Sequence, residues 1–135
     1  MNAEMIQKRI DSMFPGTMGV KLIDITKDRV LAEMPVREDL CTAGKILHGG
    51  AYMAFADTLG AVGTIFNMPA DARTSTIESK TNFMGSAPAG TKVIGESTPL
   101  HRGRTTQVWT TRITSESGKL LAVVTQTQMV MMPAG

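Results

Sequence analysis

The sequence has little cysteine, little histidine and little net charge, and each shortage excludes a class of protein. One cysteine, Cys41, cannot form an intrachain disulfide, and with only two histidines no cluster has the spacing of a zinc site. The net charge of +2 is too small to indicate binding to nucleic acid or to an anionic membrane. No apolar run reaches about 18 residues without a polar break, which excludes a membrane-spanning helix.

What the sequence does contain is typical of one globular domain. Its 135 residues are 42% hydrophobic and 19% charged, the proportions of a folded chain. We expect a single domain over residues 1–135, large enough to bury roughly two thirds of its unfolded surface. The first residues carry acids at Glu4 and Asp11 and no long apolar segment, so they do not resemble a signal peptide, and we predict a cytoplasmic location.

Hydrophobic periodicity predicts a short helix, two strands, one buried helix and four strands, in that order. The first helix covers 2–13 and is stopped by the Phe14-Pro15-Gly16 sequence. The strands cover 18–25, 29–36, 74–84, 91–100, 105–115 and 120–132, with a loop at 37–47 and a hairpin turn at 115–118. The predicted fold class is α+β, a strongly curved antiparallel sheet wrapped around one long central helix.

The central helix is predicted from the long apolar segment KILHGGAYMAFADTLGAVGTIF, residues 45–66. About 17 residues from Gly50 onward are too many for an ordinary strand, and the sequence at 67–69 stops the helix. Gly60 and Gly63 lower helix propensity and lie near one face of this helix. We expect another element to approach the helix closely at these two glycines.

A single carboxylate, Asp57, lies in the middle of this apolar helix. At about 100° per residue, Gly50, Met53, Asp57 and Ala61 share one stripe of the helix. Burial of an ionised carboxylate is costly unless the group is paired. Asp57 therefore either faces a wet edge, bonds a neighbouring backbone amide, or has a functional role.

The His48-Gly49-Gly50 sequence stands where the loop enters the helix. Free N–H groups point outward at a helix start, the dipole is positive there, and glycines let a ligand approach the backbone. Main chain alone builds an oxyanion hole in this way, although a tight turn would need the same glycines. Such a helix start, with a carboxylate farther along the helix, supplies the minimum for hydrolysing an acyl bond.

These two groups are far apart within one helix. Asp57 follows Gly49 by eight residues, which is about 12 Å along the axis. One carbonyl cannot touch both groups of the same chain, but two copies of the helix running antiparallel across a twofold axis bring Gly49 of one chain to Asp57 of the other. The sequence therefore predicts an obligate homodimer with two symmetric sites.

With His48-Gly49-Gly50 followed by Asp57 nine positions after the histidine, the chain resembles the hotdog-fold acyl-CoA thioesterases. It is most similar to the phenylacetate-pathway type, which is also seen in the hydroxybenzoyl-CoA and medium-chain acyl-CoA thioesterases. The segments TIESKTNFMGSAPAG (76–90) and HRGRTTQVWTTRITSESGKLLAVVTQT (101–127) extend the resemblance over essentially the whole chain. The resemblance implies a homodimer, commonly paired into a homotetramer, with the active site at the dimer interface.

The resemblance also implies roles for four residues. Gly49 would donate its amide to the thioester oxygen, and Asp57 would be the base that activates water or the nucleophile that attacks the thioester carbon. Thr76 matches a Ser or Thr that holds the water or the carboxylate, although threonine is also common in any strand. His48 is grouped with them, but its first interpretation is structural, as the residue that orients the loop. No cofactor and no metal ion are implied, because coenzyme A is part of the substrate.

One position departs from the family pattern. Relatives often carry Asn or Gln six residues before the motif histidine, where this sequence has Thr42. A threonine hydroxyl can donate one hydrogen bond but does not have the reach of an amide. The departure bears on the identity of the substrate more than on the reaction.

Further residues are predicted to contact the substrate. Gly50 leaves room for a ligand beside the helix start. The acyl pocket is predicted from apolar residues that in most proteins are simply core: Phe83, Met84, Met53 and Phe55. Contact with the CoA phosphates is predicted from the densest basic group near a turn, although an exposed turn is often basic for solubility alone: His101, Arg102 and Arg104.

We therefore predict a cofactor-free thioesterase that hydrolyses a short-chain or aromatic acyl-CoA, with Asp57 of one chain and the Gly49 amide of its neighbour. An alternative is a non-catalytic acyl-CoA-binding or sensing protein, which would not need a costly carboxylate beside the acyl group. A hotdog dehydratase or hydratase uses a histidine in other motifs, and only His48 and His101 are present. The acyl group is not fixed by the sequence, because Met-rich walls adapt to many shapes.

Overall fold

The computed structural model describes residues 2–134, so residues 1 and 135 of the predicted domain lie outside the described range. The helices are α1 (Ala3–Asp11), α2 (Phe14–Met18) and α3 (Gly49–Asn67), with a turn of 3-10 helix at Glu38–Leu40. The strands are β1 (Lys21–Thr26), β2 (Arg29–Pro35), β3 (Cys41–Thr42), β4 (Ile46–Leu47), β5 (Arg73–Phe83), β6 (Lys92–Arg102), β7 (Thr106–Ser115) and β8 (Leu120–Met131).

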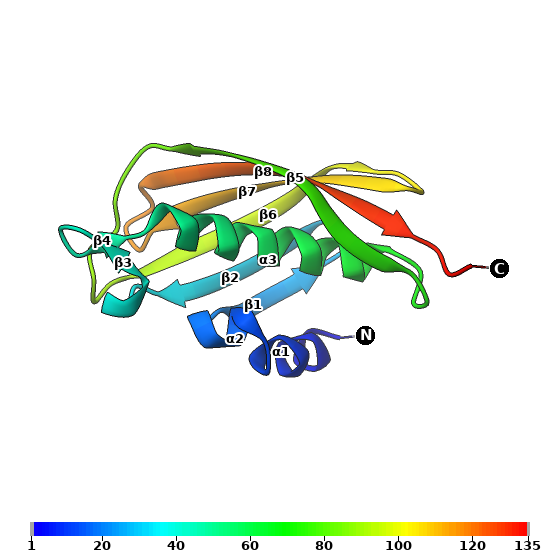
Figure 1. The fold of residues 1–135 in the computed structure, drawn as a ribbon, viewed down its shortest axis with the longest axis horizontal. Helices are drawn as coiled ribbons and strands as arrows, with labels where there is room; N and C mark the ends of the chain where they lie inside the picture. Colours follow the sequence, from blue (N-terminus) through cyan, green and yellow to red (C-terminus); the bar gives the residue numbers. More distant parts are fainter. Residues whose placement is uncertain (1, 135) are drawn as a thin grey trace.

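Six of these strands form one antiparallel sheet in the order β1-β2-β6-β7-β8-β5. Figure 1 shows α3 running along one face of this curved sheet, with α1 and α2 beside the β1 edge. The short strands β3 and β4 pair with each other just before α3 begins. A long helix wrapped by a curved antiparallel sheet is the hotdog fold, so the predicted fold class is confirmed.

The helix α3 packs closely against the sheet, and 10 of its 19 residues are buried. A Cβ added at Gly60 would overlap the amide of Gln126 on β8. A Cβ added at Gly63 would lie 2.6 Å from the ring of Trp109 on β7. The expectation that these two glycines admit a neighbouring element is therefore confirmed, and each one receives a different, fully buried side chain of the sheet.

The beginning of the chain differs from the expectation. The prediction of a strand over 18–25 is wrong at its start, because Phe14 begins α2 and β1 begins only at Lys21. Pro15 lies in the first turn of α2, where a helix tolerates proline because that N–H would have no intrahelical partner. Gly19, with φ +84°, then ends α2.

The remaining elements follow the predicted order, and their ends match the predicted ends to within two residues. The predicted loop 37–47 is the exception, because it contains the 3-10 turn and the β3–β4 hairpin. Lys45 stands in that hairpin at φ +56°, a conformation that a single residue adopts in a tight turn. The segment 37–47 therefore has regular structure and leads directly into the first turn of α3.

Strand β5 follows α3 and forms one edge of the sheet, paired with β8 within residues 2–134. Its pairing register shifts at Ile77, between Thr76 and Glu78, which is a β-bulge. Thr74 and Thr76 are half-buried, whereas Ile77 and Glu78 are both exposed, so the inside–outside alternation changes phase at this point. A bulge re-aims the side chains beside it, and this one follows the residue that faces Asp57.

Candidate active site

One stripe of α3 is accessible while the rest of the helix is mostly buried. Gly50 and Met53 are exposed, Asp57 and Ala61 are half-buried, and most residues between them are buried. The predicted stripe is confirmed. Asp57 is neither a fully buried charge nor a fully solvated one, so its carboxylate depends on its hydrogen-bond partners.

The head of α3 leaves one backbone donor free. His48 is the N-cap residue, and its Nδ1 accepts a hydrogen bond of 2.7 Å from the Gly50 N–H. This bond gives His48 a structural role, because it fixes how the chain enters the helix. Gly49 is the first helical residue, and no group within residues 2–134 accepts from its N–H. The Gly49 amide is therefore the donor that a ligand can use, at the positive end of the helix dipole.

Asp57 lies in the middle of α3, and a residue of β5 hydrogen-bonds to its carboxylate. The Thr76 hydroxyl donates to Asp57 Oδ1 at 2.6 Å. This contact joins two of the residues that the sequence singled out, across 19 positions of the chain. A hydrogen bond to an ionised acceptor is short and strong, so it orients the carboxyl group.

Two glutamines of β8 complete the surroundings of Asp57, and neither was predicted. Gln126 Nε2 lies 3.2 Å from the Asp57 carbonyl oxygen and 3.3 Å from Asp57 Oδ1. Gln128 Nε2 donates to Thr76 Oγ1, and Gln128 Oε1 accepts from Thr74 Oγ1 at 2.9 Å. Both glutamine side chains are fully buried. We call Thr74, Thr76, Gln126 and Gln128 the carboxylate network.

The sequence does hold a signal for these glutamines. On β8, every second residue points to the core, and this set contains Val124, Gln126, Gln128 and Val130. Two adjacent amides among apolar residues of a core-facing set are unusual, because a buried amide costs free energy unless it is hydrogen-bonded. Strand periodicity therefore indicates that both amides have polar partners, but not which partners.

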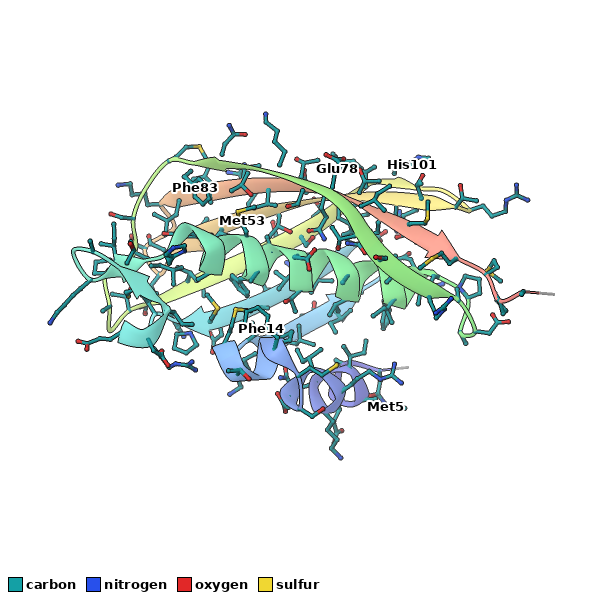
Figure 2. All side chains as sticks on the ribbon, viewed as in Figure 1. Met5, Phe14, Met53, Glu78, Phe83 and His101 are labelled. Carbon is teal, nitrogen blue, oxygen red and sulfur yellow. The ribbon has the colours of Figure 1, made fainter. Side chains whose placement is uncertain are left out.

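Aromatic side chains surround the head of the helix. A Cβ added at Gly49 would lie 3.2 Å from Cζ of the Phe83 ring. The same ring meets the Tyr52 ring edge to face, with 5.9 Å between the ring centroids. Figure 2 shows Phe83 and Met53 over the first half of α3. Phe83, Met84 and Met53 all keep exposed surface, so they are available to a ligand or a second chain. Burial raises the pKa of the Tyr52 phenol above its usual value.

The other predicted contact residues lie in two separate parts of the chain. Figure 1 shows the β3–β4 hairpin, which contains Thr42, and the β6–β7 turn at opposite ends of the molecule. The Arg102 guanidinium is engaged by Asp28 Oδ1 and the Lys27 carbonyl oxygen, each at 2.8 Å. His101 and Arg104 are exposed. One chain therefore does not bring Thr42 and the basic turn together.

Two cavities lie near opposite ends of α3. One of about 230 Å³ is lined by residues that include His48 and Gly50. The other, of about 600 Å³, is lined by residues that include Ile65 and Thr74. Asp57 lines neither cavity, so a single chain does not enclose its carboxylate in either of them.

Within residues 2–134, no group of three or more His, Cys, Asp or Glu side chains is placed to hold a metal ion. None of the helices in this range combines the length and the apolar character needed to cross a membrane.

Comparisons with known proteins agree on one family. The model of the thioesterase superfamily matches residues 44–122, which include the head of α3 and Asp57. A Vibrio cholerae protein with an esterase name is 34% identical over 100 residues, 74% of this chain and 66% of that protein. The 1,4-dihydroxy-2-naphthoyl-CoA hydrolase of Escherichia coli is 31% identical over 105 residues, 78% of this chain and 76% of that protein. A thioesterase structure from Haemophilus influenzae superposes with a TM-score of 0.93 at 24% identity, covering 100% of this chain and 94% of that chain.

Proposed function

Because the chain belongs to the thioesterase superfamily and is a thioester hydrolase, we propose that it hydrolyses an acyl-CoA with a short-chain or aromatic acyl group to the free acid and coenzyme A. The observation that carries the proposal is the accessible Asp57 carboxylate, held at Oδ1 by Thr76 on a helix whose head offers the free Gly49 amide. The name of the E. coli relative supports an aromatic acyl group.

In the proposed reaction, Asp57 is the general base. As the oxygen of a water bonds to the thioester carbon, Asp57 takes one water proton, and the C=O π electrons move to the oxygen. The N–H of Gly49 of the partner subunit donates to this oxyanion. When the carbonyl re-forms and the C–S bond breaks, the CoA thiolate takes the proton from Asp57, which restores the carboxylate.

Nucleophilic attack by Asp57 on the thioester is a second mechanism that the same two groups support. The Asp57 carboxylate would then bond to the thioester carbon and expel the CoA thiolate, which leaves an acyl anhydride on Asp57. Water would hydrolyse the anhydride to the free acid and the Asp57 carboxylate, and the remaining proton would pass to the CoA thiolate. Neither course draws on a cofactor, because coenzyme A enters as part of the substrate.

A homodimer is part of the proposal because one chain separates the two groups. Gly49 and Asp57 lie about 12 Å apart along α3. Strand β5 is an open edge within residues 2–134 and carries the exposed apolar side chains of Ile77 and Phe83. A long edge strand with exposed apolar residues is a surface suited to pairing with another chain. We propose that two chains pair with their α3 helices antiparallel, and that such dimers pair into a homotetramer.

The coenzyme A moiety is proposed to lie against the basic β6–β7 turn. His101 and Arg104 are exposed there and can approach phosphate groups. Arg102 is tied to the β1–β2 turn through Asp28, so it holds the basic turn in place rather than reaching outward. Thr42 and Gly50 belong to the other end of α3 and would meet the thioester end of the substrate bound by the neighbouring chain.

Mixing two inactive variants tests the shared site. Asp57→Asn removes the base, and Gly49→Pro removes the N–H while proline is accepted at the first helical position. In a heterodimer of the two variants, one site has lost both groups and the other has kept both. Random exchange of subunits should therefore restore about one quarter of the wild-type rate of thiol release from acyl-CoA. The matched control mixes Asp57→Asn with Gly49→Ala, which keeps the N–H.

The result separates the alternatives. Restored activity on mixing supports a site built from two chains. If the mixture stays as inactive as its components after subunit exchange is shown by mass spectrometry, the shared site is wrong. If the wild-type protein releases no thiol from any acyl-CoA in a panel of short-chain and aromatic substrates, the proposed substrate class is wrong.

A further inference from the structure

The hydrogen bonds of the carboxylate network have one direction. An ionised carboxylate only accepts, and a threonine hydroxyl has one proton, so the Thr76 proton points to Asp57 Oδ1. Gln128 must then present its Nε2 donor to Thr76, which leaves Gln128 Oε1 to accept from Thr74. Gln128 therefore supports the direction in which Thr76 donates, although it does not touch Asp57 itself.

Gln126 brings a second donor to the same oxygen. Its Nε2 bridges Asp57 Oδ1 and the Asp57 carbonyl oxygen, at 3.3 and 3.2 Å. The amide lies directly on the backbone of Gly60, where any Cβ would overlap it. The missing side chain at Gly60 is therefore what lets Gln126 reach the carboxylate.

The two oxygens of Asp57 consequently differ. Oδ1 accepts from Thr76 and Gln126, whereas no group in residues 2–134 donates to Oδ2. In the same range, the buried side-chain atoms without a partner are Ser79 Oγ, Thr81 Oγ1 and Gln126 Oε1. Oδ2 is not among them, so it remains open to an approaching molecule. Donors on Oδ1 hold the plane of the carboxylate and leave Oδ2 as the oxygen available for chemistry.

We propose that Gln126 and Gln128 are positioning residues that anchor Asp57 Oδ1 and thereby reserve Oδ2 for the reaction with water or thioester. The inference rests on the proposed function. Without the two amides, the carboxyl group is free to turn about its Cβ–Cγ bond, and the reactive oxygen spends less time in line with the thioester carbon. The glutamines act through Asp57 and Thr76 and need not contact the substrate.

Replacing each glutamine by methionine, which has a similar shape and no donor, tests this. Gln126→Met and Gln128→Met should each lower kcat about 10-fold with KM unchanged, because Gln126 donates to the charged carboxylate itself and Gln128 fixes the Thr76 hydroxyl that donates to it. The matched control is Gln107→Met, a buried glutamine on β7 that accepts from Trp109 Nε1 instead.

A pair of glycine variants tests the same point without removing a polar group. Gly60→Ala places a methyl group against the Gln126 amide, and Gly63→Ala places one against the Trp109 ring on the same helix. Both crowd the core, but Gly60→Ala alone should lower kcat about 10-fold with KM unchanged. This pair remains decisive if a glutamine variant fails to fold.

The outcomes separate this inference from the proposed function. If wild-type protein hydrolyses acyl-CoA and the glutamine variants keep its kcat, the inference is overturned. Equal losses in Gln107→Met or Gly63→Ala overturn it as well, since they indicate a structural effect only. If wild-type protein hydrolyses no acyl-CoA, the proposed function fails. The positioning role is then judged by the NMR signal of the Asp57 carboxyl carbon, whose chemical shift should change in Gln126→Met and stay fixed in Gln107→Met.

Discussion

The head and the middle of α3 carry the two halves of the candidate site, and they are built in different ways. At the head, the free donor is main chain, and its geometry is set by His48, which caps Gly50 only two residues away. In the middle, the carboxylate of Asp57 is held by side chains that lie 19 and 69 positions away along the chain. A donor that every helix start offers needs only a local cap. A single charged side chain in a mostly buried helix needs partners from other elements.

The largest effect is expected from replacing the carboxylate in the middle of α3. Asp57→Asn keeps the shape of the side chain but removes the base, and we expect kcat to fall about 10³-fold. The measurement is thiol release from acyl-CoA substrates. The control is Asp71→Asn, an exposed carboxylate on the loop between α3 and β5. Full activity in Asp57→Asn would show that the carboxylate has no part in the reaction.

Removing the free backbone donor at the head of α3 is expected to have the next largest effect. Gly49→Pro removes the N–H at the first helical position, and His48 already has the extended backbone that a residue before proline prefers, with φ −64° and ψ 141°. We expect kcat to fall about 10²-fold, the usual loss of one oxyanion donor. Gly49→Ala, which keeps the N–H, should lose much less. Equal losses in the two variants would place the effect in the crowding of Phe83 rather than in the amide.

The local cap at the head can be tested separately from the chemistry. His48→Ala removes the acceptor for the Gly50 N–H and should lower the free energy of unfolding by about 1 kcal/mol. His48→Asn can cap the helix again and should recover most of that loss. Thermal or denaturant unfolding measures both variants. If His48→Asn recovers stability but not activity, the imidazole has a role beyond the cap.

The smallest expected effect concerns Tyr52, which packs against Phe83 at the head of α3. Tyr52 is the sole tyrosine, so its ionisation is followed directly by absorbance near 295 nm. Burial raises the pKa of the Tyr52 phenol above 10.0, so the folded protein should ionise at higher pH than the unfolded chain. Because the folded state then binds more protons, the free energy of unfolding should decrease as pH rises past 10.0. Tyr52→Phe should weaken this dependence, and an unchanged pH dependence would contradict it.

The same contrast explains how much could be predicted from the sequence. The central helix, the stripe that contains Asp57 and the six long strands follow from periodicity, which depends on neighbours along the chain. The start of α2 at Phe14 was missed because Pro15 reads as a helix stop, although proline fits the first turn of a helix. Gln126 and Gln128 were missed because their partners come from α3 and β5, and strand alternation does not identify a partner on another element.

The sequence by itself determined the parts of this protein that depend on local rules: the apolar helix, its capped glycine head, and the placement of one carboxylate on the same stripe. Tertiary structure alone decided what holds that carboxylate. The pairing of β5 in the sheet places Thr76 at Asp57, just before the bulge, and the bare backbone at Gly60 admits Gln126 from β8. Hydrogen bonds act over about 3 Å, so only the fold that brings these distant segments together can select one oxygen of Asp57 and leave the other open.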